Sequence, residues 1–221
     1  MTTKKVISFD LDGTIVKPDY NEFIWFKEIP QLYSEKYNVD FAEAREIVAR
    51  EYEKVGENDV RWYTLKYWLD YFGFKVEEGE VLEKYADKIE VYSEAILVLK
   101  NLHKRYSLVL ASAMPRNFIN VKLRKENLFQ YFDEIFSAIS DFNMIKKKAE
   151  FYKSACRRLG ISPRNLVHIG DNYEADYLAP RKAGAVAFYL NRNGLHSLTD
   201  SFVVCDLLEF MYKLEISHLT S

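Results

Sequence analysis

VISFDLDGT, residues 6–14, is the stretch that decides the fold. Its apolar residues predict a buried strand, and Asp10 and Asp12 follow before Gly13 breaks the pattern. Residues i and i+2 of an extended chain point the same way, so both carboxylates would face one pocket beyond the carboxyl edge of a sheet. Two anions so close repel each other unless a cation or a shared proton neutralises part of the charge. A surface turn rich in Asp and Gly is the competing interpretation, and this stretch alone does not separate the two.

A second apolar run followed by acidic residues lies near residue 170. NLVHIGDNYEAD, residues 165–176, is a mostly apolar run followed by Asp171 and a second acid, Asp176. A third strand-like run, SLVLASAM, residues 107–114, carries the small hydroxyl of Ser112. Three lysines follow another apolar patch. Together these groups form the complement that would hold a dianionic phosphate beside Mg²⁺.

Short apolar runs recur along the chain between segments with helical spacing. Continuous rather than alternating apolar residues are typical of parallel strands that are covered on both faces. Strands that alternate with helices predict βαβ units, and therefore an α/β fold with a Rossmann-like, doubly wound parallel sheet. The predicted strands are residues 6–9, 107–111, 134–139, 165–169, 186–190 and 202–204.

The segment between the first two strands, residues 17–92, is far longer than one crossover helix requires. Its patterns predict an inserted all-helical cap domain of roughly 75 residues, which is enough for a small independent unit. The catalytic core would then consist of residues 1–16 and 93–221.

Within this segment, Asp40 is expected to cap a helix together with Glu43. Residues 59–73 are expected to form one further helix. Pro30 should interrupt a helix around residues 20–37, because proline lacks the N–H that a helix interior uses.

All three tryptophans, Trp25, Trp62 and Trp68, fall in the inserted segment. An aromatic substrate pocket is one interpretation. We favour the other, an aromatic core, because a small bundle of helices needs large side chains to bury enough apolar surface.

Composition bounds the function. The chain has 221 residues, of which 48% are hydrophobic and 29% charged, as is ordinary for a soluble globular protein. A net charge of −2 provides no overall attraction to nucleic acid. Cys156 and Cys205 form no CxxC motif, which favours a reducing, cytoplasmic location. No apolar run approaches the ~20 residues of a membrane span, so neither a membrane nor nucleic acid is an expected partner.

These pieces occur in an order typical of a known family. Residues 10–14 match DxDGT, Ser112 matches a Ser or Thr after a strand, a lysine follows, and residues 170–176 match GDxxxxD. The chain therefore resembles the haloacid dehalogenase superfamily over nearly its whole length outside the insertion. The resemblance implies a helical cap of the C1 type, which closes over the site, and a phosphatase-like activity.

The resemblance also implies roles for the acids. Asp10 would be the nucleophile that becomes an aspartyl phosphate, and Asp12 the general acid and base. Mg²⁺ would be held by Asp10, the backbone carbonyl of Asp12, and Asp171. Asp176 would be an outer-shell partner of the metal, although an acid favoured by the dipole at a helix N-terminus is an equally good interpretation.

For the substrate phosphate, the resemblance implies a hydrogen bond from Ser112 and help from the backbone N–H groups of Gly13 and Ala113. Without that context, Ser112 would be interpreted as a turn residue.

The active-site lysine lies in the run 146–148. Its family spacing, counted back from Tyr152, favours Lys146 as the catalytic and phosphate-binding residue, with Lys147 as the alternative. A solvated helix face is the default interpretation of such runs, and we apply it to the basic residues 122–125. His168 is expected to be a core residue rather than a ligand, because no second histidine is suitably spaced.

The expected function is a Mg²⁺-dependent phosphatase that hydrolyses a small phosphorylated metabolite, since a helical cap would exclude protein-sized substrates. A phosphoglycolate phosphatase-like activity is one option within the family. A phosphomutase similar to β-phosphoglucomutase and a catalytically silent phosphometabolite-binding module are the alternatives. A haloacid dehalogenase is disfavoured, because such family members lack an acid at the position of Asp12. The sequence indicates neither the natural substrate nor the oligomeric state.

Overall fold

The computed structural model describes residues 5–194 and 200–216 and contains a six-stranded parallel sheet. The strands lie in the order β3-β2-β1-β4-β5-β6, and each neighbouring pair is parallel. This order confirms the predicted α/β, doubly wound fold. The strands are β1 (Val6–Phe9), β2 (Ser107–Ser112), β3 (Glu134–Ser137), β4 (Leu166–Gly170), β5 (Val186–Leu190) and β6 (Val203–Val204).

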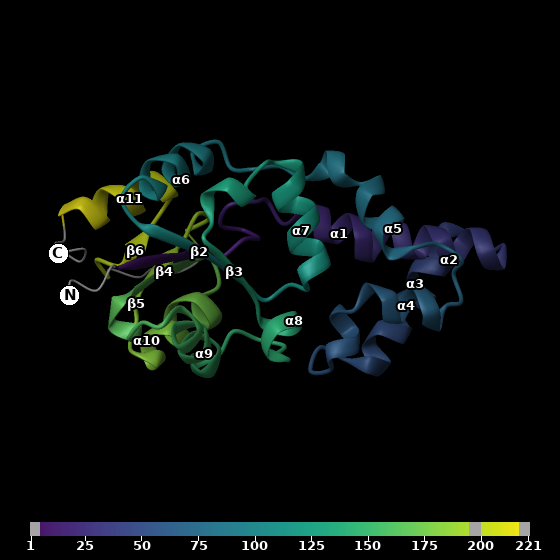
Figure 1. Cartoon of the computed structure of the whole chain (residues 1–221). Coiled ribbons are helices and arrows are strands. Elements are labelled where there is room, and N and C mark those ends of the chain that lie inside the picture. The colour runs from purple at the N-terminus through teal and green to yellow at the C-terminus, as the bar shows by residue number, and fades with distance from the viewer. Residues whose placement is uncertain (1–4, 195–199, 217–221) are drawn as a thin grey trace.

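Helices cover both faces of the sheet (Figure 1). Helices α6 (Ala95–His103) and α11 (Leu207–Ile216) contact each other over one face, and α9 (Ala149–Leu159) and α10 (Ala179–Ala183) contact each other over the opposite face. The side chains of successive residues in β1 point to opposite faces of the sheet. Phe9 packs in the cluster that includes α6 and α11, whereas Val6 packs in the cluster that includes α9 and α10. Burial on both sides explains why the strands read as continuous apolar runs.

Strand β3 is two residues shorter than predicted. Residues 134–139 were expected to be extended, but β3 ends at Ser137. The Ser137 side chain accepts a hydrogen bond from the N–H of Ser140 at 2.9 Å and so caps helix α8 (Ala138–Phe142). A serine N-cap therefore ends the strand and starts a helix inside the apolar run.

The helices of the inserted segment lie together beside the sheet (Figure 1). The predicted cap at Asp40 is confirmed, because its side chain accepts a hydrogen bond from the N–H of Glu43 at 3.0 Å. The elements are α1 (Asp19–Phe23), the π-helical turn η1 (Ile24–Glu28), α2 (Ile29–Tyr37), α3 (Phe41–Val55), the 3₁₀ turn η2 (Val60–Tyr63), α4 (Leu65–Tyr71), α5 (Glu78–Lys84) and the 3₁₀ turn η3 (Ala86–Lys88).

Two details of this segment differ from the predictions. The single helix expected over residues 59–73 is broken at Thr64, whose backbone is extended and whose hydroxyl donates to the carbonyl of Val60 at 2.9 Å. Pro30 does not interrupt the chain of helical turns. It lies in the first turn of α2, directly after η1, where the wider π-helical turn accommodates the missing N–H.

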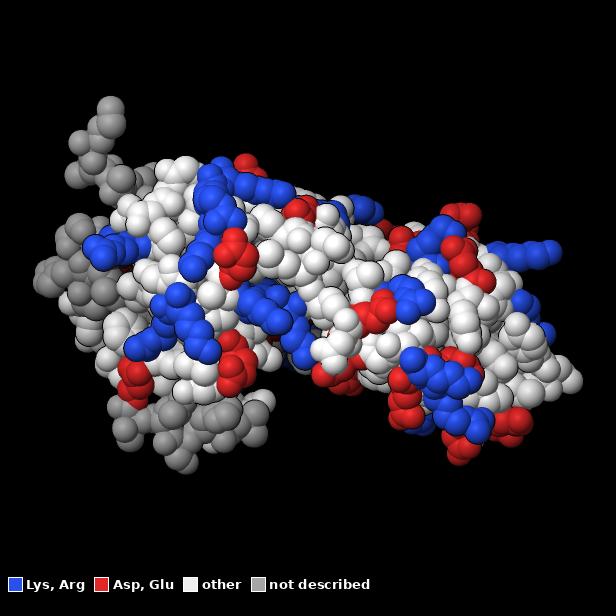
Figure 2. Space-filling model, turned by 90° about the horizontal axis from the view of Figure 1, so that it is seen from below, with Lys and Arg blue, Asp and Glu red and all other residues white. Residues whose placement is uncertain are grey.

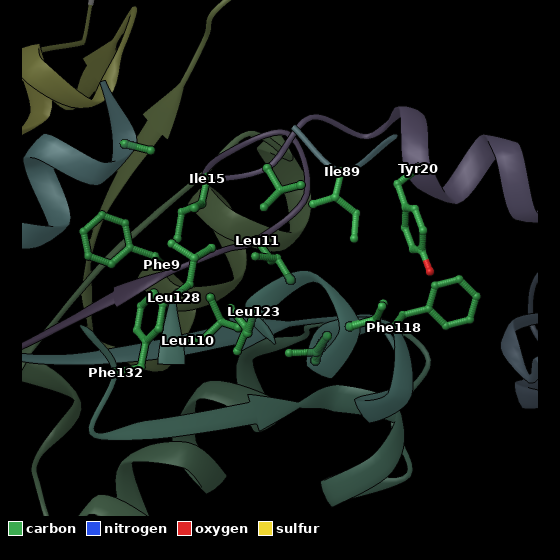
Figure 3. Close-up of a cluster of buried hydrophobic side chains, with 14 of the residues drawn as sticks. Phe9, Leu11, Ile15, Tyr20, Ile89, Leu110, Phe118, Leu123, Leu128 and Phe132 are labelled. Carbon is green, nitrogen blue, oxygen red and sulfur yellow. The ribbon is translucent and has the colours of Figure 1, made fainter. Parts of the chain in front are cut away.

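Large aromatic side chains form the centre of the helical segment. Trp68 is fully buried, and its ring centroid lies 4.6 Å from that of Tyr52. The aromatic-core interpretation is therefore confirmed for Trp68. Trp25 stacks on Phe118 of helix α7 (Arg116–Lys125), with 5.5 Å between the ring centroids. Figure 3 shows Tyr20 and Phe118 next to each other at one end of a cluster that reaches back to Phe9 in β1, so one core spans both parts of the chain.

Candidate active site

Strand register brings three polar strand ends together. Strand β1 lies between β2 and β4, and Phe9 is opposite both Leu110 and Ile169. The N–H of Asp10 continues this ladder by donating to the carbonyl of Ile169 at 2.9 Å. Parallel strands end at the same edge, so the residues that follow Phe9, Leu110 and Ile169 must meet there.

The turn after β1 runs close to the end of β4. Gly13 has a φ of +79°, a backbone conformation that favours glycine. A Cβ atom at this position would collide with the carboxylate of Asp171. The N–H of Gly13 donates to the carbonyl of Val16 at 2.7 Å. The turn itself therefore uses the donor that was expected to bind phosphate.

Three carboxylates converge at this edge. Asp10, Asp171 and Asp176 each offer an oxygen atom that lies within 4.8 Å of the others. Asp10 and Asp176 are buried, whereas Asp171 is exposed. Hard oxygen donors with one solvent-facing member suit Mg²⁺, which uses few protein carboxylates and keeps several waters. The residues that the structure brings together thus fit this ion.

The structure places Lys147, and not Lys146 as expected, beside these acids. Lys147 is 3% exposed, and its Nζ pairs with Asp10, with Asp176 at 2.5 Å and with the carbonyl of Ala111 at 3.1 Å. Lys146 is exposed, and its Nζ lies 3.3 Å from Oε1 of Glu57 in the inserted segment. The reason is local geometry: the lysines precede α9 in a non-helical stretch, where neighbouring side chains alternate in direction, and only the middle one points inward.

The charges of this cluster are tightly linked. Burial raises the pKa of Asp10 well above its usual range, with Asp176 and Asp171 adding to the effect and Lys147 opposing it. Burial disfavours the charged form of Lys147, but Asp10 and Asp176 prevail and raise its pKa above the usual range. Burial likewise opposes ionisation of Asp176, yet Lys147 and His168 hold the pKa of that carboxyl well below its usual range. A divalent cation would compensate the excess of negative charge that remains.

Asp171 shows the same crowding on the solvent side. Although the residue is exposed, its carboxylate faces the backbone of Gly13. Burial of the carboxyl group among these atoms, followed by the charge of Asp176, raises the pKa of Asp171 to about 6.

A buried hydrogen-bond network supports the cluster from the α9 side of the sheet. His168 lies fully buried in β4, as expected for a core residue. Its Nε2 lies 3.0 Å from Oδ1 of Asp176 and 3.0 Å from the hydroxyl of Tyr152, and its Nδ1 lies 2.7 Å from the hydroxyl of Ser8. Burial lowers the pKa of His168. The network therefore holds Asp176 in place.

Ser112 ends β2 at the same edge of the sheet. It is buried, and its Oγ accepts a hydrogen bond from the N–H of Met114 at 3.1 Å. Accepting this bond leaves the hydroxyl proton for donation to another group. Ala113, the next residue, is partly exposed at the strand end.

Lys122 is a site residue that the sequence reasoning missed. The run 122–125 was interpreted as a solvated face, but Lys122 is fully buried in α7 and pairs with Oδ1 of Asp12. The helical spacing carried the signal, since Lys122 follows Phe118 by four positions and Ile119 by three, which places it on the buried stripe of the helix. Arg124 and Lys125 are exposed, as predicted.

Comparisons with known proteins place this fold beside a family of hydrolases. The sequence model of the hydrolase family described as haloacid dehalogenase-like hydrolase matches residues 4–184. The GMP/IMP nucleotidase YrfG of Escherichia coli (strain K12) is 23% identical over 168 residues, covering 75% of this chain and 73% of that protein. The glyceraldehyde 3-phosphate phosphatase of Methanocaldococcus jannaschii is 20% identical over 89% of both chains. The crystal structure of a HAD phosphatase from Thermococcus onnurineus matches with a TM-score of 0.82 and 26% identity, over 95% of this chain and 97% of that one.

Proposed function

Because the chain belongs to the haloacid dehalogenase-like hydrolase family, we propose that it is a Mg²⁺-dependent phosphatase acting on a small phosphorylated metabolite. The family and its phosphatase and nucleotidase relatives support a hydrolase of phosphate esters. The observation that carries the proposal is the meeting of Lys147 with Asp10 and Asp176, beside Asp171.

Asp10 is the proposed nucleophile. Its carboxylate oxygen forms a bond to phosphorus while the bond between phosphorus and the ester oxygen breaks, which leaves an aspartyl phosphate on the protein. Lys147, held against Asp10, neutralises charge on the phosphoryl group, and Ser112 donates a hydrogen bond to it. Asp12 donates a proton to the departing oxygen and later takes one from the water that attacks the aspartyl phosphate.

Asp10, Asp171 and the backbone carbonyl of Asp12 are the proposed Mg²⁺ ligands. When bound, the ion would neutralise charge on the phosphoryl oxygens. Asp176 is proposed to support this centre from behind, since it already accepts hydrogen bonds from the N–H of Asn172 at 3.1 Å and from Lys147.

The substrate is proposed to be small. We assign residues 17–92 to a cap and the remainder to the catalytic core, so the site would lie where the two parts meet. A cavity of about 110 Å³ beside Asp171, lined by Gly13, Tyr92 and Arg192 among others, supports a small ligand. The nucleotide and triose phosphate named for two relatives set the first compounds to test.

Charged side chains of both signs lie interspersed on the face that Figure 2 presents. No helix in the described part of the chain is long and apolar enough to cross a membrane. Cys156 and Cys205 are free, which supports the proposed reducing, cytoplasmic location.

A screen of phosphate monoesters tests the proposal. Release of inorganic phosphate from GMP, IMP, glyceraldehyde 3-phosphate, phosphoglycolate and p-nitrophenyl phosphate is measured with Mg²⁺ and with EDTA. We expect release with Mg²⁺ only, its loss in Asp10→Asn, and phosphate bound to wild-type protein after an acid quench during turnover. Activity that survives in Asp10→Asn would disprove the mechanism.

The same screen separates the alternatives. A phosphomutase would convert a sugar phosphate into its isomer without releasing phosphate. A catalytically silent binding module would release none from any compound while still binding one of them.

A further inference from the structure

Lys122 is a buried cation whose position the general mechanism above leaves without a role. It is fully buried in the middle of α7, and its Nζ pairs with Oδ1 of Asp12 and lies 2.8 Å from Oδ1 of Asn21. The ammonium also lies 5.5 Å from the ring centroid of Tyr20. Removing a lysine ammonium from water costs free energy unless partners compensate for the lost hydration. The burial of Lys122 therefore calls for an explanation.

The two oxygens of Asp12 differ in their surroundings. Oδ1 is held by Lys122. Oδ2 is buried and, among the residues that the structure describes, has no hydrogen-bond partner. An unsatisfied buried carboxylate oxygen is unfavourable, and it is a feature expected of an atom that exchanges a proton with a bound ligand.

Asn21 links this pair to the inserted helices. It lies in α1, the first helix after the turn that carries Asp12, whereas Lys122 belongs to α7 of the core. Two acceptors from two parts of the chain therefore share one ammonium. Tyr20, the neighbour of Asn21, anchors the same helix by donating to the carbonyl of Leu82 at 2.7 Å and by packing edge-on to Phe118.

We propose that Lys122 is a positioning residue for Asp12, which holds Oδ1 so that Oδ2 is the oxygen that exchanges the proton, and that Asn21 ties this alignment to α1. The inference rests on the proposed function, in which Asp12 is the general acid and base. As the phosphorus bond to Asp10 forms and the bond to the leaving group breaks, the proton on Oδ2 passes to the departing oxygen. Lys122 itself touches no reacting atom.

Leaving-group dependence distinguishes positioning from a purely structural role. An alkoxide leaves poorly without a proton, whereas p-nitrophenolate is stable as an anion and needs little acid assistance. The value of kcat/KM reports the first irreversible step, in which the leaving group departs. A misplaced Asp12 should therefore affect alkyl esters far more than p-nitrophenyl phosphate, while general damage to the site should affect both equally.

The main experiment compares Lys122→Met with Lys125→Met, an exposed position on the same helix. The substrates are p-nitrophenyl phosphate and either glyceraldehyde 3-phosphate or GMP, whichever the wild type hydrolyses faster. For Lys122→Met we expect kcat/KM to fall by about 10²-fold on the alkyl ester and by less than about 10-fold on the aryl ester. Lys125→Met should match the wild type. Equal losses on the two substrates, or no loss, would overturn the inference.

A double-mutant cycle tests whether Lys122 acts through Asp12. In an Asp12→Asn background, adding Lys122→Met should lower kcat/KM on the alkyl ester by less than about 2-fold, because the group that it positions is already disabled. Losses that multiply would overturn the inference.

Asn21→Ala provides a second route should Lys122→Met fail to fold, as judged by circular dichroism. It keeps the ion pair and removes the other acceptor. We expect a smaller loss with the same preference for the alkyl ester, and an unchanged ratio of the two substrates would argue against the link to α1. A wild-type protein that hydrolyses no phosphate monoester would overturn the proposed function and this inference with it, whereas equal losses on both esters overturn this inference alone.

Discussion

Lys147 Nζ lies 2.5 Å from Oδ1 of Asp176, and both residues are buried at the carboxyl edge of the sheet. The same ammonium also pairs with Asp10. One cation thus joins the end of β1 to the turn after β4, and these are the two segments that carry the acids of the DxDGT and GDxxxxD patterns.

Because only Lys147 occupies this position, substitutions of Lys147 and Lys146 should affect activity to different extents. Lys147→Met should lower kcat/KM for phosphate release by at least about 10²-fold, because a preorganised buried cation next to the reacting group is lost. Lys146→Met removes only an exposed pair with Glu57 and should change kcat/KM by less than about 3-fold. A larger loss in Lys146→Met than in Lys147→Met would restore the original assignment.

The hydroxyl of Tyr152 should contribute to stability. It donates to the carbonyl of Ala175 at 2.7 Å and lies within hydrogen-bond distance of Asp176 and His168. Tyr152→Phe leaves these buried groups short of a partner, so the free energy of unfolding should fall by about 1–3 kcal/mol in urea titrations. Tyr212→Phe, at an exposed site, is the matched control and should change it by less than about 0.5 kcal/mol. Similar values for the two variants would show that the network is not stabilising.

The carboxylate of Asp171 should make the metal-free protein less stable above about pH 6. Its pKa in the folded protein is raised to about 6 from an ordinary value of 3.8. The unfolded chain therefore releases this proton first, and the folded state loses stability as the pH rises from about 4 to about 6. In EDTA at pH 7.5, Asp171→Asn should have a higher melting temperature than the wild type, and the difference should vanish near pH 4.

Added Mg²⁺ should change the melting temperatures of the wild type and Asp171→Asn to different extents. Mg²⁺ should raise the melting temperature of the wild type at pH 7.5 and raise that of Asp171→Asn much less, because binding to the folded state alone is stabilising. An equal response of both proteins to Mg²⁺ would remove Asp171 from the proposed ligands.

Gly170 has no room for a side chain. A Cβ atom there would lie 2.6 Å from Cβ and 2.6 Å from Oδ2 of Asp176. Gly170→Ala should therefore displace Asp176, lower the free energy of unfolding by about 1–3 kcal/mol and reduce phosphatase activity at least about 10-fold. Gly79→Ala, in an exposed part of α5 where a Cβ meets nothing within 4 Å, should instead stabilise by about 0.5–1 kcal/mol. Unchanged activity in Gly170→Ala would show that Asp176 tolerates displacement.

Local patterns predicted most of the fold. Each strand is a run of apolar residues buried on both faces, and such a run is visible without knowing its neighbours. The N-cap at Asp40 was equally visible, because a cap depends on residues three positions apart. The predicted element boundaries were wrong where a single residue ended one element and began another. The apolar run after Phe136 leaves the sheet because Ser137 caps α8, and the helix expected over residues 59–73 breaks at Thr64.

Some residues of the candidate site could likewise be predicted from local patterns, and others could not. Asp10, Ser112 and Asp171 could be proposed from sequence, because each follows an apolar strand and parallel strands end at one edge. Gly13 could not be judged, since the partner of its N–H is set by the path of the turn to Val16. Lys122 was not recognised as a buried residue, because three of the four residues in its run carry positive charge and such runs are usually exposed to solvent.

The sequence by itself determined the order of strands and helices, the long insertion after β1 and the acids at the strand ends, because these follow from hydrophobic runs and short spacings. Only the tertiary structure decided which lysines serve the acids. Lys146 and Lys147 are adjacent and chemically identical, and the path of the chain before α9 turns one of them outward and the other onto Asp10. Lys122 meets Asp12 through the packing of α7 against the turn after β1, a contact between distant segments that no local pattern encodes.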